Sequence, residues 1–170
     1  MRLVAELEGF QCHTCGKWHQ GLPLDYAYDA PYYWSESLRA DGDSFLNSDF
    51  CVIKKKDFFV RGLIEIPVIG RDEPFRWGVW TSLSKSNFDR IVDLWRDPKL
   101  LEEPPYFGWL SNSIELYPHT LNLKINLHSK DISRRPYLLL EQTDHPLAIE
   151  QRVGITMERL REIAERSLHR

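Results

Sequence analysis

The sequence predicts an α+β fold built on a mainly antiparallel sheet of about five to seven strands, with the helices on one face. Two observations support this class. The middle of the chain holds strand-like segments joined by short polar turns, which favour antiparallel pairing. Segments with the apolar spacing of a helix come mainly after these strands. At 170 residues, the chain is expected to form a single domain over 1–170.

The predicted strands are rich in β-branched and aromatic residues. Ile64, Ile66 and Val68 share one face by alternation, as do Leu121, Leu123, Ile125 and Leu127 in a later segment. In that later segment the other face is polar, which indicates a strand with one side in water. Strands are expected over residues 49–53, 58–68, 75–83, 106–110, 120–128 and 136–141.

Helices are predicted from apolar residues three and four positions apart. The clearest case starts after Ser84 or Ser86, either of which can cap the first turn. Pro31 favours the start of a short helix. Near the C-terminus, Gly154 separates two helices, and Thr156 can cap the second. The expected helices cover residues 31–39, 84–95, 144–152 and 156–167, the last two forming a C-terminal pair within 144–168.

The composition limits the cellular setting and the partners. The chain has 22 Lys and Arg against 25 Asp and Glu, a net charge of −3, so a broad basic surface for nucleic acid is not expected. Three cysteines favour a reducing compartment. Glu6 and Glu8 interrupt any signal peptide, and no apolar run is long enough to span a membrane. We expect a cytoplasmic protein whose unknown partner is a protein or small molecule.

Cys12 and Cys15 have the C-x2-C spacing that lets two thiolates meet one Zn²⁺ ion, and Gly16 follows them. His19 and Cys51 can supply the other two ligands, so residues 10–19 are predicted to form a zinc-knuckle-like loop with a structural zinc ion. His13 is less well placed, between the cysteines. Plain buried thiols are the alternative. A redox pair is disfavoured because residues 16–18 are a poor helix start.

His145 with Glu141 or Asp144 is the one candidate for general acid–base catalysis. The simpler interpretation is ordinary capping at a helix start, with a salt-bridged surface helix after it, and we favour that interpretation.

Trp77 and Trp80 are three positions apart in a predicted strand, where successive side chains point to opposite faces. One of the two is therefore expected to face away from the core. Beside Arg61 or Arg76, an outward tryptophan can stack on a ligand or hold a partner protein. The alternative is a large aromatic core, and we favour it for most of the group formed by Trp77, Trp80, Tyr106, Phe107 and Trp109. The basic residues Lys130, Arg134 and Arg135 are expected to form a solvated turn.

Five sequence motifs, taken in their order along the chain, resemble those of one bacterial family, called domain of unknown function 2199. The resemblance covers roughly residues 10–165. They are Cys12-x2-Cys15-Gly16-x2-His19, Phe58–Pro67, Phe75–Ser84, Pro104–Leu110 and Thr143–Thr156. The resemblance implies a bacterial and cytosolic protein. It implies no activity, because the family has none assigned.

The sequence therefore favours a zinc-stabilised binding domain without catalysis. One alternative is a hydrolase or transferase that uses His145 with Glu141 and Asp144. Another is a protein of the toxin-immunity type, which an acidic, aromatic-rich surface would suit.

Overall fold

A computed structural model describes residues 9–169. Residues 1–8, which include Glu6 and Glu8 of the signal-peptide argument, lie outside the described residues, as does residue 170. The first strands are β1 (Phe10–Gln11), β2 (Trp18–His19), β3 (Asp25–Ala27), β4 (Phe45–Leu46) and β5 (Phe50–Ile53). The later strands are β6 (Asp57–Ile66), β7 (Phe75–Leu83), β8 (Tyr106–Leu110), β9 (Lys124–His128) and β10 (Tyr137–Leu140). The helices are α1 (Lys85–Asp93), α2 (Pro146–Val153) and α3 (Met157–Leu168), with short 3-10 helices η1 (Glu36–Ala40) and η2 (Pro98–Glu102).

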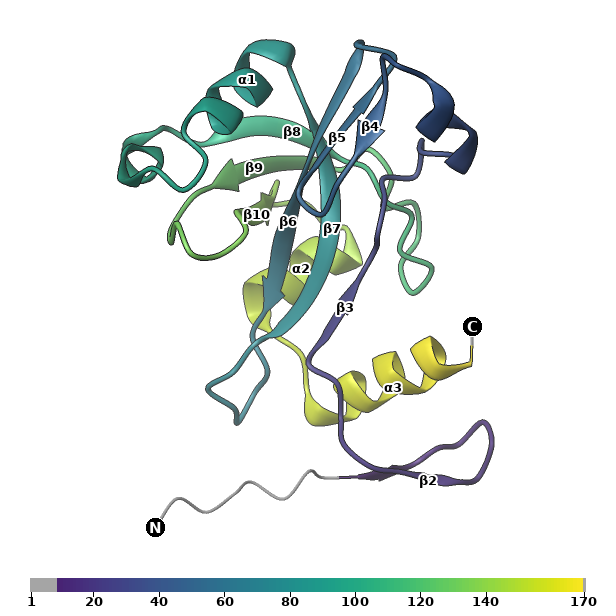
Figure 1. The fold of residues 1–170 in the computed structure, drawn as a ribbon. Helices are drawn as coiled ribbons and strands as arrows, with labels where there is room; N and C mark the ends of the chain where they lie inside the picture. The colour runs from purple at the N-terminus through teal and green to yellow at the C-terminus, as the bar shows by residue number, and fades with distance from the viewer. Residues whose placement is uncertain (1–8, 170) are drawn as a thin grey trace.

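The main sheet closes into a barrel. Its strand order is β3-β7-β8-β9-β10-β6-β5-β4, and β6 also pairs with β7, so that β6 to β10 form a five-stranded ring (Figure 1). Closure comes from a parallel contact between β10 and β6, at Tyr137 and Leu63. The β3–β7 pairing is also parallel, and the remaining pairings of this sheet are antiparallel. The predicted α+β class and mainly antiparallel pairing are confirmed, with eight strands in the sheet instead of five to seven.

Alternation along the strands fills the barrel with apolar side chains. Val60, Ile64 and Ile66 of β6 are buried in the main core together with Trp77 of β7. Gly62 lies on the same inward side of β6, and a Cβ there would come within 2.7 Å of the Leu138 side chain. The missing side chain therefore makes room for β10 to approach β6 and close the ring.

A second layer covers the outer side of the same strands. Trp80, on the opposite side of β7 from Trp77, packs with Cys51, Ile53 and Phe59, and the partly buried Tyr28, Trp34, Leu38 and Leu46 lie over this cluster. The Trp80 indole N–H donates to the carbonyl of Tyr28 at 2.9 Å. Both Trp77 and Trp80 are 0% exposed. Trp80 does face away from the main core, as the spacing predicts, but the expectation that it is available to a ligand or partner is wrong, because both sides of β7 are covered.

The helices lie at different ends of the barrel (Figure 1). α1 begins at the predicted cap Ser84, and its Phe88 packs on Phe58 at the start of β6, with 5.3 Å between ring centroids. α2 and the cap of α3 lie near the other end, where Ile155 donates to the carbonyl of Pro67. Thr156 caps α3 as predicted. Of the described helices, none has both the length and the apolar character needed to cross a lipid bilayer.

Candidate functional site

Residues 10–19 form a small hairpin apart from the barrel. β1 and β2 pair antiparallel, with Phe10 opposite His19. Between them, the N–H of Cys12 donates to Lys17 and the N–H of Gly16 donates to Cys12, both at 2.9 Å. Gly16 has φ +69°, a backbone region that favours glycine. The tight turn brings the two thiols of the C-x2-C motif to one side of the hairpin.

Four donor side chains converge at this hairpin. Cys12, Cys15, His19 and His169 each offer one ligand atom, and these atoms all lie within 4.8 Å of one another. The Cys12 Sγ is 3.1 Å from Nε2 of His169, and the Cys15 Sγ is 3.4 Å from Nε2 of His19. Donors around a tetrahedral Zn²⁺ lie roughly 3.3–3.8 Å apart, given bonds of about 2.3 Å to sulfur and 2.0 Å to nitrogen. The group can therefore hold a metal ion with small side-chain movements.

The surroundings of Cys12 favour its thiolate, which is the form that binds metals. The side chain is buried, which by itself raises its pKa. Hydrogen bonds from the backbone of Cys15 and from the ring of His169 outweigh that effect, and the pKa of Cys12 is lowered to about 6. Cys15 is exposed and lies at the outer side of the group.

Helix α3 supplies the fourth donor. Ala164 of α3 is buried against Phe10 and Cys12, and the carboxylate of Glu165 accepts from the backbone N–H of His13 at 3.0 Å. The His13 ring also contacts Glu165, at 2.9 Å, and is not part of the metal group. His169 follows the end of α3 at its C-cap. Its role has no signal in the sequence, because it lies 157 positions from Cys12 and belongs to no ligand spacing.

The structure does not bring Cys51 to this group. Cys51 lies in β5 with 0% exposure, packed in the cluster of Phe59 and Trp80. Burial raises the pKa of its thiol to about 12. His169 takes the place that the sequence analysis gave to Cys51, because the β4–β5 hairpin pairs with β6 of the barrel while the N-terminal hairpin packs on α3.

Arg61 lies on the outer side of β6 and is mostly covered, with its side chain 11% exposed. Its guanidinium carbon is 5.9 Å from the centroid of the Trp80 ring. It donates to the carbonyl of Ser48 at 3.4 Å and is 3.7 Å from the exposed carboxylate of Asp29. Trp80 therefore stacks with Arg61 inside the protein, and its ring is closed to a ligand.

The catalytic candidates are not assembled into an acid–base pair. His145 is the N-cap of α2: its Nδ1 accepts from the N–H of Leu147 at 3.1 Å, and its Nε2 contacts the carbonyl of Pro118. Glu141 and Asp144 are both exposed, and neither is bonded to the His145 ring among residues 9–169. With both ring nitrogens engaged by backbone groups, His145 acts as a capping residue.

Replacing His145 with alanine should lower the free energy of unfolding by about 1 kcal/mol, the usual cost of losing a helix N-cap. His145→Asn should recover most of this loss, because asparagine is a good N-cap. Urea denaturation of the three proteins measures the difference. If the asparagine variant is as unstable as the alanine variant, capping is not what the imidazole provides.

The geometry defines a class: a small five-stranded barrel domain with a Cys and His group, able to hold a metal ion, between its N-terminal hairpin and its last helix. The chain belongs to the family described as an uncharacterized protein conserved in bacteria, DUF2199, whose model matches residues 11–155. The matched region contains Cys12, Cys15 and His19 and ends before His169. No curated protein and no solved structure gives a significant match.

Proposed function

We propose that this protein is a non-catalytic binding domain of the bacterial cytoplasm, with its N-terminal hairpin held by a structural Zn²⁺ ion. One observation carries the proposal: the ligand atoms of Cys12, Cys15, His19 and His169 all lie within 4.8 Å of one another. Two thiolates and two imidazoles are a donor set that selects zinc over magnesium or calcium.

A structural role follows from the number of donors. Four protein ligands complete a tetrahedral zinc site and leave no position for a substrate. The ion joins residues 12–19 to the end of α3, two segments that are otherwise linked by the small Phe10, Cys12 and Ala164 cluster and by the contacts of Glu165 with His13. Zinc thereby fixes the two ends of the described chain to each other and leaves the barrel surface for a protein or small-molecule partner.

Metal analysis of the purified protein tests the proposal. We expect about one equivalent of zinc per chain, and less than about 0.2 equivalents would overturn it. Cys12→Ser and His169→Gln should each weaken zinc binding at least tenfold, since even changes in residues that only orient a ligand cost about 10- to 100-fold. Chelator competition gives these affinities.

Cys51→Ala is the matched control, because it also removes one thiol but leaves the four donors in place. It should retain one equivalent of zinc with unchanged affinity. Loss of zinc from Cys51→Ala together with full retention in His169→Gln would show that the ligand set is the one expected from the sequence.

A further inference from the structure

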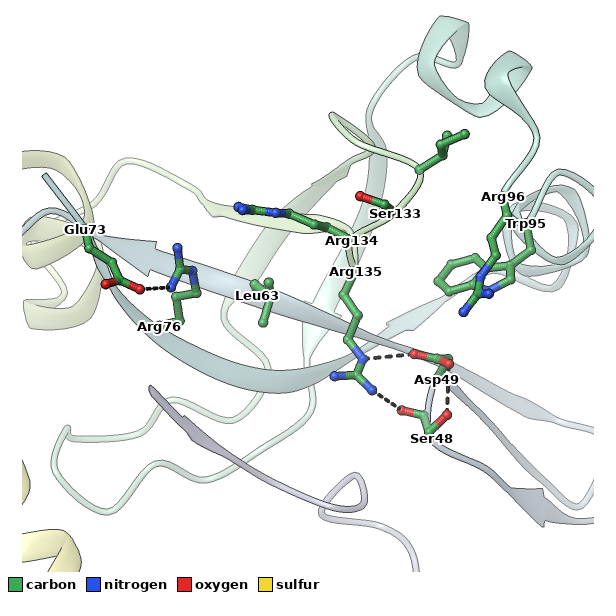
Figure 2. A pocket seen from close by; sticks show the side chains of 11 residues that line it. Ser48, Asp49, Leu63, Glu73, Arg76, Trp95, Arg96, Ser133, Arg134 and Arg135 are labelled. Carbon is green, nitrogen blue, oxygen red and sulfur yellow. Dashed lines mark hydrogen bonds and ion pairs between the residues drawn. The ribbon is translucent and has the colours of Figure 1, made fainter. Parts of the chain in front are cut away.

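A cavity of about 580 Å³ lies on the outer side of β6, around Leu63 (Figure 2). Four segments distant in sequence meet there: the β4–β5 turn, β7 with the turn before it, the end of the α1 region, and the loop before β10. Its size is in the range of small-molecule sites. The lining residues are Ser48, Asp49, Leu63, Glu73, Arg76, Trp95, Arg96, Ile132, Ser133, Arg134 and Arg135.

The lining carries an excess of positive charge, with four arginines against two carboxylates, in a chain whose net charge is −3. Arg76 is neutralised, since it lies 3.1 Å from Glu65 and 3.4 Å from Glu73. Arg135 donates to Asp49 at 2.9 Å and to the carbonyl of Ser48 at 3.3 Å (Figure 2). These two arginines are held in place by the protein.

The other two arginines are held less tightly by acidic groups. Arg134 is 64% exposed and forms one long ion pair, 3.8 Å from the carboxylate of Asp131, which is itself 48% exposed. Arg96 forms no ion pair within residues 9–169. Arg96 also has φ +64°, where glycine or asparagine would fit with less strain. This backbone conformation favours a smaller residue for stability, yet the position carries a long cationic side chain.

A further cation, Arg61, donates to the carbonyl of Ser48, which belongs to the cavity lining. Arg61 is 11% exposed, and its Nε has no hydrogen-bond partner within the described part of the chain. Burial and the charge of Arg135 both lower its pKa. The carboxylates of Asp29 and Asp49 act in the opposite direction on Arg61, and Asp49 is also the ion-pair partner of Arg135.

The cavity also has an apolar part, formed by Leu63, Ile132 and Trp95. The Trp95 ring is fixed by a T-shaped contact with Phe50, at 4.7 Å between centroids. Guanidinium groups with free donors bind phosphate oxygens in pairs, and an aromatic wall beside them suits the organic part of a small ligand.

We propose that this pocket binds a small organic molecule bearing a phosphate group, with Arg134 and Arg135 on the phosphate and Arg96 and Trp95 beside the rest of the ligand. This inference rests on the binding role proposed above and not on the zinc site. Zinc content and phosphate binding are separate measurements, so failure of one leaves the other standing.

Isothermal titration with inorganic pyrophosphate at low salt tests the pocket. We expect saturable binding that weakens as salt is added, because the arginines are partly exposed. Arg134→Gln should weaken binding about tenfold or more, the value of one charge-assisted hydrogen bond. Arg96→Gly should weaken it as well, while the melting temperature stays unchanged or rises because glycine accepts the positive φ.

Arg161→Gln provides the matched control, since Arg161 is an exposed arginine of α3 outside the pocket. It should bind pyrophosphate like the unmodified protein. The proposal is overturned if no saturable binding occurs up to about 10 mM pyrophosphate. It is equally overturned if Arg161→Gln weakens binding as much as Arg134→Gln, because the effect would then come from overall charge.

Discussion

Replacing Trp80 with alanine should lower the free energy of unfolding by about 3–5 kcal/mol, the range found when a large buried aromatic side chain is removed. Trp80 is 0% exposed and packs between β7 and the layer that contains Tyr28. The substitution also leaves the carbonyl of Tyr28 without the indole N–H that lies 2.9 Å from it. Denaturant unfolding followed by circular dichroism measures the loss.

Trp109→Ala is the control for this experiment. Trp109 lies on the outer side of β8, is 40% exposed and contacts Phe107 edge-on. Its removal creates no closed cavity, so we expect a loss below about 1 kcal/mol. Similar losses for Trp80→Ala and Trp109→Ala would contradict the covered position of Trp80 and would restore it as a candidate for ligand contact.

Removal of zinc from the metal-loaded protein should release the N-terminal hairpin and the last turn of α3 while the barrel stays folded. The hairpin has its own small core, whereas Leu160 and Ile163 of α3 belong to the barrel core. A ligand present at about 1,000 times its dissociation constant stabilises the folded state by about 4 kcal/mol. That amount should disappear from the stability of the hairpin region on addition of a strong chelator.

Hydrogen exchange read by mass spectrometry locates this loss. Peptides covering residues 10–19 and 164–169 should lose protection, and peptides from β6 and β7 should keep theirs. Cys12→Ser should exchange like the chelated protein even when zinc is added. Equal loss of protection throughout the barrel would mean that the ion supports the whole fold.

Local patterns in the sequence predicted the long elements well. β7 and β8 occupy the predicted residues 75–83 and 106–110, and Ser84 caps α1. The predicted strand 120–128 begins only at Lys124, because Asn122 has φ +67° and the buried hydroxyl of Thr120 bonds to the backbone of Asn112 and Ile114. Alternation along residues 120–123 therefore belongs to a turn.

Features that depend on distant contacts could not be predicted in the same way. β3 and β4 have three and two residues, too few for a pattern, and the segment 31–39 forms the 3-10 helix η1 at Glu36–Ala40. Apolar and polar residues alternate in the same way in an open sheet and in a closed barrel. The pairing of Tyr137 with Leu63 that closes the barrel therefore leaves no pattern in the sequence.

The candidate sites show the same division. The C-x2-C spacing predicts Cys12, Cys15 and His19 as neighbours, since they share one hairpin. His169 joins them only through the docking of α3. Arg134 and Arg135 look like a solvated turn in the sequence, and their relation to Arg96 exists only because the fold places their segments around one cavity.

The strand order also bears on how copies of this protein meet one another. The two longest strands, β6 and β7, are paired on both sides within the sheet. Its free edges are β3 and β4, with three and two residues. Such short edges expose few unpaired backbone groups to a second chain. A route to aggregation that many β-rich proteins must guard against, edge-to-edge growth of sheets, is thereby limited by the topology itself.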